Sequence, residues 1–354
     1  MTDINKIISY PIFFERNRVN RVYVGGKPYP EFFGTNEEGD NMFPEEWIAS
    51  TVKAINSDYY GPRDGVSIVR DTDLFFDDLM KNYSKELCGH RKYDCLIKIL
   101  DSAIRLPVQV HPTKEFSRKH LNSDYGKTES WLVINKRPGA KMYFGFNNRY
   151  TKEYLMELEE KSENDKEIMA SVCQSVDVEI GDLFIIPAGL IHAIGAGCTV
   201  IEVQEPTDFT IQPERWCGDK HLNYQEEFLS LDKETAMDCF DLDLINEVAI
   251  SKAVIKPETL IKKEGYTKES LITYKHTTCF SENRHTVEKS EFTLDWAPAV
   301  YIVLEGEGEL IGKDYNHKLV RGDYFFLPYT CEGKIKARSD SKLVLIECLP
   351  SMQK

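Results

Sequence analysis

The stretch GDLFIIP, residues 181–187, returns about 140 residues later as GDYFFLP, residues 322–328. In each copy the Gly-Asp pair favours a tight turn, the apolar residues favour a short buried strand, and the proline ends that strand. Two copies of one hairpin-based unit predict two small β-barrels in a single chain. The alternative is a chance match, because Gly-Asp followed by apolar residues is common in β proteins.

Further strand patterns surround both copies of the motif. Around the first copy they comprise residues 108–112 (VQVHP), 129–134 (ESWLVI), 141–146 (KMYFGF) and 198–205 (CTVIEVQE). The second copy follows YIVLEGEGELIG, residues 301–312, which has a strand-turn-strand pattern. The chain is strand-rich from about residue 253 to its last residues, and we therefore expect a mainly β protein.

Three segments have the apolar spacing of helices instead. Residues 93–106 (YDCLIKILDSAIRL) carry helix-spaced apolar residues before a break at Pro107. Residues 151–172 predict an inserted helical hairpin or helix pair, and residues 224–246 predict a second helical insertion.

Charge and composition exclude several classes of function. The 354 residues are 42% hydrophobic and 29% charged, as expected of a folded protein rather than a disordered one. The net charge of -14 argues against general binding to nucleic acid or to an anionic membrane surface, because an acidic field repels phosphate groups. An anionic substrate must therefore be held by a local cluster of cations.

The nine cysteines are odd in number, scattered, and without a C-x-x-C pair. This usage predicts a reduced, cytoplasmic protein. Residues 1–18 (MTDINKIISYPIFFERNR) lack the apolar core of a signal peptide, and the longest apolar runs have the length of strands rather than of membrane spans.

Four side chains near the first motif suggest a metal site. Gln109 and His111 are two residues apart, so a strand places them on one face. Glu129 opens the next strand pattern, and His192 follows the repeated motif directly. Two imidazoles, a carboxylate and an amide oxygen are suitable ligands for zinc and less distinctively for iron, manganese or cobalt. A catalytic ion needs a further position for water or substrate.

Each of these residues also has an ordinary structural interpretation. A single histidine among apolar residues is more often hydrogen-bonded in a core or on a surface, and Glu129 alone suits the solvent face of a strand. We expect the remaining histidines to lie at the surface: His90, His120, His221, His276, His285 and His317. The second motif is followed by PYTCEGK, which has no histidine where His192 falls, so we expect no metal in the second barrel.

The motifs LIKILDSAIRLPVQVHP, GKTESW, GDLFIIPAGLIHAIGAG and IEVQEPTD resemble, in order and spacing, those of the type I mannose-6-phosphate isomerase family of the cupin superfamily. The resemblance is clear over residues 93–216 and weaker at EEWIAS, residues 45–50, and around residues 236–242. It implies two cupin-type (jelly-roll) barrels with inserted helices: residues 1–252, with insertions near 151–176 and 220–246, and residues 253–354. The active site then lies at the mouth of the first barrel, partly walled by the insertions.

The resemblance also implies one zinc ion per chain, bound by Gln109, His111, Glu129 and His192. Members of the family interconvert mannose 6-phosphate and fructose 6-phosphate by moving a proton between C1 and C2 through an enediol. Such chemistry needs a base with a near-neutral pKa, a hydrogen-bond donor to the carbonyl oxygen, and stabilisation of the enediolate charge. A metal ion can supply the last of these.

Three further family positions correspond to Lys127, Glu202 and Asp208. Lys127 is a donor to a sugar oxygen, a phosphate ligand, or a solvated loop lysine. Glu202 is an inward-facing base or a structural carboxylate that orients a cation, and Asp208 is a base or a turn cap.

The chain departs from the family pattern at two positions. Gln212 stands where the family commonly has an arginine facing the active site. An uncharged amide can neither form the bidentate pair of hydrogen bonds to a phosphate nor balance the charge of an enediolate. Arg215 is either a replacement cation in the catalytic set or a surface residue before Trp216. Gly126 occupies the place of a histidine found before the lysine in some members, so that histidine is not a required base here.

These observations leave four functions open. The first is a metal-dependent isomerase acting on a hexose 6-phosphate, with a small sugar phosphate as its partner. The second is an isomerase of another, unphosphorylated sugar, for which Gln212 is the motive. The third is a cupin that binds sugar without turnover, and the fourth is an iron-dependent dioxygenase, whose metal site is usually richer in histidine.

Overall fold

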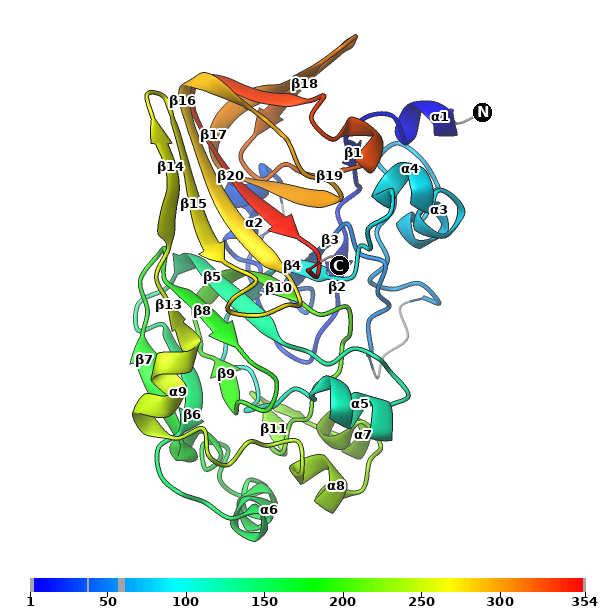
Figure 1. Ribbon diagram of the computed structural model, residues 1–354. Coiled ribbons are helices and arrows are strands. Elements are labelled where there is room, and N and C mark those ends of the chain that lie inside the picture. Colours follow the sequence, from blue (N-terminus) through cyan, green and yellow to red (C-terminus); the bar gives the residue numbers. More distant parts are fainter. Residues whose placement is uncertain (1–2, 37, 57–60, 353–354) are drawn as a thin grey trace.

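The computed structural model describes residues 3–36, 38–56 and 61–352. Its described strands form several antiparallel sheets, with helices around them (Figure 1). The mainly β class predicted from the sequence is confirmed.

The first large sheet has seven strands. In spatial order they are β13 (Val254–Ile255), β8 (Leu183–Ile186), β5 (Glu129–Lys136), β10 (Cys198–Gln204), β4 (Leu96–Ser102), β3 (Glu45–Ile48) and β2 (Arg18–Val19).

The second large sheet has eight strands. In spatial order they are β1 (Ile12–Phe13), β19 (Tyr324–Leu327), β17 (Ala299–Gly312), β20 (Lys336–Leu349), β16 (Ser281–Thr293), β15 (Tyr266–Ile272) and β14 (Glu258–Lys263), with β18 (Tyr315–Val320) paired to β17.

Two smaller sheets and the helices complete the described structure. One small sheet has the order β7 (Cys173–Asp177), β6 (Lys141–Phe146), β9 (His192–Ile194), and the other pairs β11 (Trp216–Cys217) with β12 (Lys220–His221). The α-helices are α1 (Ile4–Ile7), α2 (Tyr29–Phe33), α3 (Phe76–Asn82), α4 (Ser84–Cys88), α5 (Lys114–His120), α6 (Lys152–Lys161), α7 (Tyr224–Phe228), α8 (Lys233–Met237) and α9 (Asn246–Ala253). Single 3-10 turns are η1 (Ala170–Val172) and η2 (Tyr329–Cys331).

The repeated sequence motif has the same backbone geometry in both copies. Gly181 and Gly322 both have positive φ, +96° and +86°, which favours glycine in the turn. The Gly181 N–H donates to Val133 on β5 at 2.8 Å, and the Gly322 N–H donates to Val303 on β17 at 2.9 Å. In each copy the aspartate that follows the glycine accepts the N–H three residues before itself, at 2.8 and 3.0 Å. The motif strands β8 and β19 then occupy matching places in two sheets of matching strand order.

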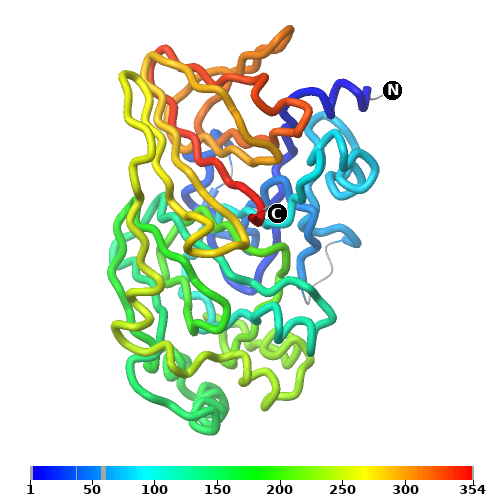
Figure 2. The backbone as a smooth tube through the Cα atoms, viewed as in Figure 1, coloured from blue at the N-terminus to red at the C-terminus, as the bar shows by residue number. Residues whose placement is uncertain are grey.

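The edge strand at one end of each large sheet comes from the other half of the chain. Ile12 and Phe13 of β1 pair with β19 of the eight-stranded sheet, and Val254 and Ile255 of β13 pair with β8 of the seven-stranded sheet. The backbone trace shows the N-terminal segment running beside the C-terminal half (Figure 2). The two sheets therefore exchange their first strands.

The large sheets bury one face against each other. One core cluster contains residues of both sheets, among them Ile201 on β10 and Ile346 on β20. Neighbouring residues on the opposite faces belong to two separate clusters, one containing Val200 and the other Leu345. Since successive strand residues point to opposite faces, each sheet has its own interior on the side away from the other.

The helix expected over residues 93–106 is wrong, because the central part of this segment is strand β4. All seven residues of β4 are buried, including Lys98 and Asp101. Both faces of the strand are covered, so the period-two alternation of a half-exposed strand is absent. The polar residues instead interrupt the apolar run at a spacing that resembles a helix.

Three other local predictions hold only in part. Residues 151–172 contain one helix, α6, followed by turns and η1, rather than a hairpin. Residues 224–246 contain α7 and α8, as expected of a helical insertion. The segment 108–112 is extended but forms only the isolated bridges Gln109–His192 and Val110–Ile211 instead of a ladder.

The surface placement predicted for His285 is also wrong. This residue on β16 is 1% exposed, its Nδ1 lies 2.9 Å from the Tyr266 hydroxyl, and its Nε2 lies 3.2 Å from Glu347. The other five histidines outside the candidate site are exposed or half-buried.

All nine cysteines are buried and free. Within the described ranges, no helix combines the length and the apolar character needed to cross a membrane.

Candidate metal centre and substrate cavity

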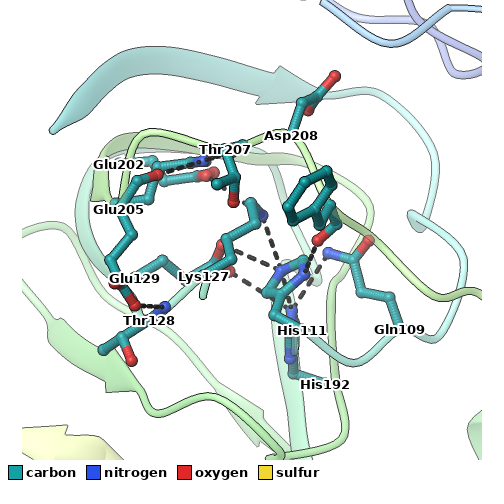
Figure 3. Close-up of polar contacts among 12 residues, drawn as sticks. Gln109, His111, Lys127, Thr128, Glu129, His192, Glu202, Glu205, Thr207 and Asp208 are labelled. Atoms are coloured by element: carbon teal, nitrogen blue, oxygen red, sulfur yellow. Dashed lines mark hydrogen bonds and ion pairs between the residues drawn. The ribbon is translucent and has the colours of Figure 1, made fainter. Parts of the chain in front are cut away.

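Three buried side chains converge at one end of the seven-stranded sheet. One ligand atom each from His111, Glu129 and His192 lies within 4.8 Å of the others, and all three residues are at most 1% exposed (Figure 3). The expectation that these residues lie together is met.

The backbone fixes the positions of these side chains. Gln109 and His192 exchange two backbone hydrogen bonds, at 2.8 and 2.9 Å, which aligns the extended segment 108–112 with β9. The Gly189 N–H donates to the His111 carbonyl at 2.9 Å. Glu129 is the first residue of β5, where it pairs with Ile186 of the motif strand β8.

The two imidazoles present the same nitrogen to the centre of the cluster. His111 Nδ1–H donates to the Phe209 carbonyl at 3.0 Å, and His192 Nδ1–H donates to the Leu190 carbonyl at 2.8 Å. A carbonyl can only accept, so these bonds leave both Nε2 atoms, 3.1 Å apart, as acceptors that face the centre of the cluster. Hydrogen bonds of this kind orient histidine ligands in metal sites.

The protonation of the cluster also suits a divalent metal. Burial lowers the pKa of His192 to about 3, with a further contribution from His111, and burial and Lys127 lower the pKa of His111. Burial raises the pKa of Glu129, but Lys127 and His111 lower it more, so the net direction is well below the usual range. Two neutral imidazoles and one carboxylate are the forms that bind zinc.

Gln109 lies beside the cluster. Its amide nitrogen is 3.2 Å from His192 Nε2, and a flip of the amide, which exchanges nearly indistinguishable atoms, places the oxygen at the same point. Gln109 is buried, and it lines the cavity described below.

Lys127 reaches into the cluster from the residue pair before β5. Its ammonium group donates to Glu129 at 2.6 Å and to His111 Nε2 at 2.7 Å. The preceding Gly126 is needed for close packing, because a Cβ at this position would lie 2.6 Å from the Pro112 carbonyl oxygen. The structure thus gives a steric reason why no histidine stands at position 126.

A cavity of about 940 Å³ of empty space, including its open mouth, extends from Gln109 and Lys127. Its cationic lining residues are Arg21, Lys98, Lys127 and Lys220, and its anionic ones are Glu45, Glu202, Asp208 and Glu226. Lys220 and Leu229 also line it, so the insertion near 220–246 forms part of the wall as expected, whereas no residue of 151–176 does.

Charges of alternating sign follow one another along this cavity. Arg21 links Asp208 to Glu45, with Nη2 2.6 Å from Asp208 and Nε 3.0 Å from Glu45. Lys98 then links Glu45, at 3.4 Å, to Glu202, at 3.6 Å. Lys127 lies 3.9 Å from Glu202 and continues the series to Glu129. The described residues of the cavity wall therefore balance four cations against four carboxylates.

Glu202 is the carboxylate with the fewest hydrogen bonds in this series. Its Oε1 has no hydrogen-bond partner among the described residues, although the side chain is 3% exposed. Burial raises the pKa of Glu202 to about 7, against the opposing effect of Lys98. The nearest cations to Oε1 are Lys98 at 3.6 Å and Lys127 at 3.9 Å. A buried carboxylate with a pKa near neutrality and an oxygen that accepts no hydrogen bond is suited to take up and release a proton.

Asp208 is fully engaged by comparison. Its two oxygens accept hydrogen bonds from Arg21 at 2.9 and 2.6 Å, and one of them also accepts the Ile55 N–H at 2.8 Å. Arg21, Glu45 and Lys98 were not predicted from the sequence as site residues. Glu45 lies in EEWIAS, where the family match is weak, and Lys98 lies in LIKILDSAIRLPVQVHP, where it is clear, whereas Arg21 lies in no matching segment.

The structure does not bring Arg215 to the cavity. Arg215 pairs with Glu159 of α6 and lies 3.9 Å from Glu227, and it is not among the residues that line the cavity. Gln212 does line the cavity, and its amide donates to the Glu226 carbonyl at 2.8 Å. The interpretation of Arg215 as a replacement cation is therefore wrong, because two buried carboxylates hold it elsewhere.

Comparison with known proteins relates this architecture to sugar-phosphate isomerases. Mannose-6-phosphate isomerase ManA of Bacillus subtilis (strain 168) is 30% identical over 246 residues, which are 67% of this chain and 70% of ManA. A solved mannose 6-phosphate isomerase from Bacillus subtilis aligns over 96% of this chain and 99% of its own, with a TM-score of 0.75 and 21% identity.

Another solved structure, a mannose 6-phosphate isomerase bound with zinc and yttrium, aligns over 97% of this chain and 100% of its own, with a TM-score of 0.70 and 14% identity. No protein-family model matches the chain. The 30% identity to ManA over two thirds of both chains nevertheless shows the family, and the chain belongs to the mannose-6-phosphate isomerase family.

Proposed function

We propose that this protein is a metal-dependent aldose–ketose isomerase that interconverts mannose 6-phosphate and fructose 6-phosphate. The observation that carries the proposal is the buried cluster of His111, Glu129 and His192 beside a cavity. The cavity is lined by Glu202, one oxygen of which accepts no hydrogen bond from the described residues. The names of the relatives support the choice of substrate.

One zinc ion per chain fits the donor set of this cluster. His111, Glu129 and His192 supply two imidazole nitrogens and a carboxylate oxygen, and Gln109 supplies an amide oxygen after a flip. The solved isomerase bound with zinc and yttrium supports the choice of metal. Bound there, the ion would stabilise negative charge that develops on the sugar oxygens.

The proton transfer is assigned to Glu202. Glu202 takes the proton from C2 of the aldose while the C1 carbonyl oxygen gains the electron pair. The proton of the O2 hydroxyl passes to O1 through the enediol, and Glu202 returns its own proton to C1, which leaves the ketose. Lys127, 3.9 Å from Glu202, donates a hydrogen bond to the sugar oxygen on which charge develops. Asp208 has both oxygens engaged by Arg21, so it shapes the wall instead of carrying the proton.

We further propose that residues 1–252 and 253–354 form two cupin-type (jelly-roll) barrels. The matching strand order and the matching motif turns of the two large sheets support this division. Ala299 on β17 pairs with Leu327, the last apolar residue of the second motif, just as Glu129 pairs with Ile186 of the first. The second barrel thus has a methyl group where the first has a metal ligand, and we expect it to bind no metal.

A coupled assay on mannose 6-phosphate tests the function. Zinc-loaded protein, chelator-stripped protein and His192→Ala are compared, with His221→Ala as an exposed-histidine control. We expect turnover that disappears on stripping, returns with zinc and is absent only from His192→Ala. A folded, zinc-containing protein without turnover on this sugar would contradict the proposal and favour an unphosphorylated sugar or binding alone.

A further inference from the structure

Arg21 is the only guanidinium among the described residues that line the cavity. It lies two residues after β2, and its side chain is 11% exposed. Nη1 and Nη2 donate to the two oxygens of Asp208, while Nε donates to Glu45 at 3.0 Å. This pair of hydrogen bonds to Asp208, here called the fork, fixes the guanidinium on the cavity wall. It also connects two segments that are 187 residues apart.

The segment that carries Asp208 has no cation of its own at the cavity. Gln212 lines the cavity but bears no charge, and its backbone N–H donates to the Glu227 carbonyl at 2.8 Å. Arg215 on the same segment is turned to Glu159 and Glu227. Lys220, which also lines the cavity, pairs with Glu226 at 2.8 Å, so the guanidinium that faces Asp208 comes from the N-terminal part of the chain.

Removal of Arg21 would leave two carboxylates facing the cavity without their shared partner. Tyr23 and Trp47 still donate to Glu45, each at 2.6 Å, and Lys98 remains 3.4 Å away. Asp208 would keep only the Ile55 N–H. The unbalanced charge of Asp208 would then repel an anionic sugar and release the segment that leads to Gln212.

We propose that Arg21 is a positioning residue for the isomerisation: its two hydrogen bonds fix Asp208, and its guanidinium balances the charge of this carboxylate, which Gln212 cannot do. The inference rests on the proposed function, because a sugar phosphate is the ligand that needs this charge. A lysine at position 21 keeps the charge but cannot form the fork, whereas an arginine at position 212 restores a guanidinium from the opposite segment.

Arg21→Lys and Arg215→Lys test the proposal as a matched pair, since both make the same chemical change close to the same segment. We expect Arg21→Lys to lose at least tenfold in kcat/KM for mannose 6-phosphate and Arg215→Lys to stay within twofold of wild type. Zinc content and Tm are measured on each variant. Equal kcat/KM for the two variants, in an active wild-type background, would overturn the role of Arg21 while leaving the proposed function intact.

Moving the guanidinium from position 21 to position 212 distinguishes a positioning role of Arg21 from a loss of protein stability. We expect the double variant Arg21→Lys/Gln212→Arg to have a kcat/KM at least threefold above that of Arg21→Lys. Inorganic phosphate should also inhibit the double variant more tightly. A merely structural role for Arg21 predicts no such rescue, so its absence counts against the proposal. A wild-type protein without any turnover would overturn the proposed function, and this inference would fall with it.

Discussion

Glu202 on β10 and Glu347 on β20 occupy the same register position in the two large sheets. Glu202 lies opposite Trp131 of β5, and Glu347 lies opposite Tyr301 of β17. Each of these aromatic residues pairs in turn with the phenylalanine in the fourth position of its repeated motif. Their surroundings differ, because Glu347 accepts hydrogen bonds on both oxygens, from Tyr301 at 2.6 Å and Asn283 at 2.7 Å, whereas one oxygen of Glu202 accepts no hydrogen bond from the described residues.

The same substitution at these matched positions should therefore have opposite consequences. Glu202→Gln removes the proton carrier, and we expect kcat to fall roughly 100- to 10,000-fold with little change in stability. Glu347→Gln disturbs a buried network in the sheet without a metal cluster, so it should cost on the order of 2 kcal/mol of stability and leave kcat nearly unchanged.

Steady-state kinetics and urea unfolding on both variants measure these effects. Comparable activity losses in the two variants would show that Glu202 acts through stability instead of chemistry.

Lys127→Gln should separate catalysis from metal binding. Lys127 donates to the ligand Glu129 and to His111, but an ammonium group is not itself a ligand. Its removal should lower kcat at least tenfold while zinc affinity stays equal to or above that of the wild type, because the competing positive charge is lost. Competition with a chromophoric chelator gives the affinity, and weaker zinc binding by the variant would contradict this account.

Zinc should stabilise the wild type and fail to stabilise His192→Ala to the same extent. A ligand that binds only the folded state at 100 times its Kd adds about 2.7 kcal/mol. Removing one buried imidazole from the cluster weakens the site, so the rise in Tm with zinc should be largely absent from the variant. Differential scanning calorimetry with and without zinc measures this, and Gln109→Ala should show an intermediate rise, since an amide oxygen is the weakest of the four donors.

Stability should decrease with rising pH because of Glu282 on β16. Burial raises the pKa of Glu282 to about 7, and one of its oxygens has no hydrogen-bond partner among the described residues, while Ser130 of β5 donates to the other. The folded-state pKa exceeds the ordinary value of 4.5, so this contribution is fully present below pH 4.5 and is lost as pH rises through about 7.

Glu282→Gln should reduce this dependence, while Glu202, whose pKa burial also raises to about 7, keeps its own contribution. We expect the variant to be more stable than the wild type by on the order of 2 kcal/mol at pH 8 and nearly equal to it at pH 4.5. Urea unfolding at both pH values gives the two differences, with Glu288→Gln, exposed on the same strand, as the control. A variant that gains no stability at pH 8 would show that Glu282 ionises without cost.

The metal cluster was predictable because its signals are local. His111 follows Gln109 at strand spacing, and Glu129 and His192 stand at the starts of strands β5 and β9, where sequence patterns are strong. The repeated motif likewise predicted matching turns, because glycine and aspartate act within a few residues of themselves.

The cavity wall was not predictable in this way. Arg21 meets Asp208 across 187 positions, and Lys98 is a buried cation in a strand covered on both faces, so neither leaves a periodic signal. Arg215, by contrast, is a candidate from the sequence because it stands three residues after Gln212. Its partner Glu159 belongs to an insertion whose packing the sequence pattern did not reveal.

The exchanged edge strands determine when the protein can finish folding during its synthesis. Strand β8 lacks its outer neighbour β13 until Val254 and Ile255 have been synthesised, long after the rest of its sheet. Ile12 and Phe13 are made about 300 residues before their partner strand β19. The N-terminal half therefore cannot reach its final form as an independent early product. Strand β1 must stay unpaired until β19 has been made, a period in which a chaperone or a second nascent chain can reach it first.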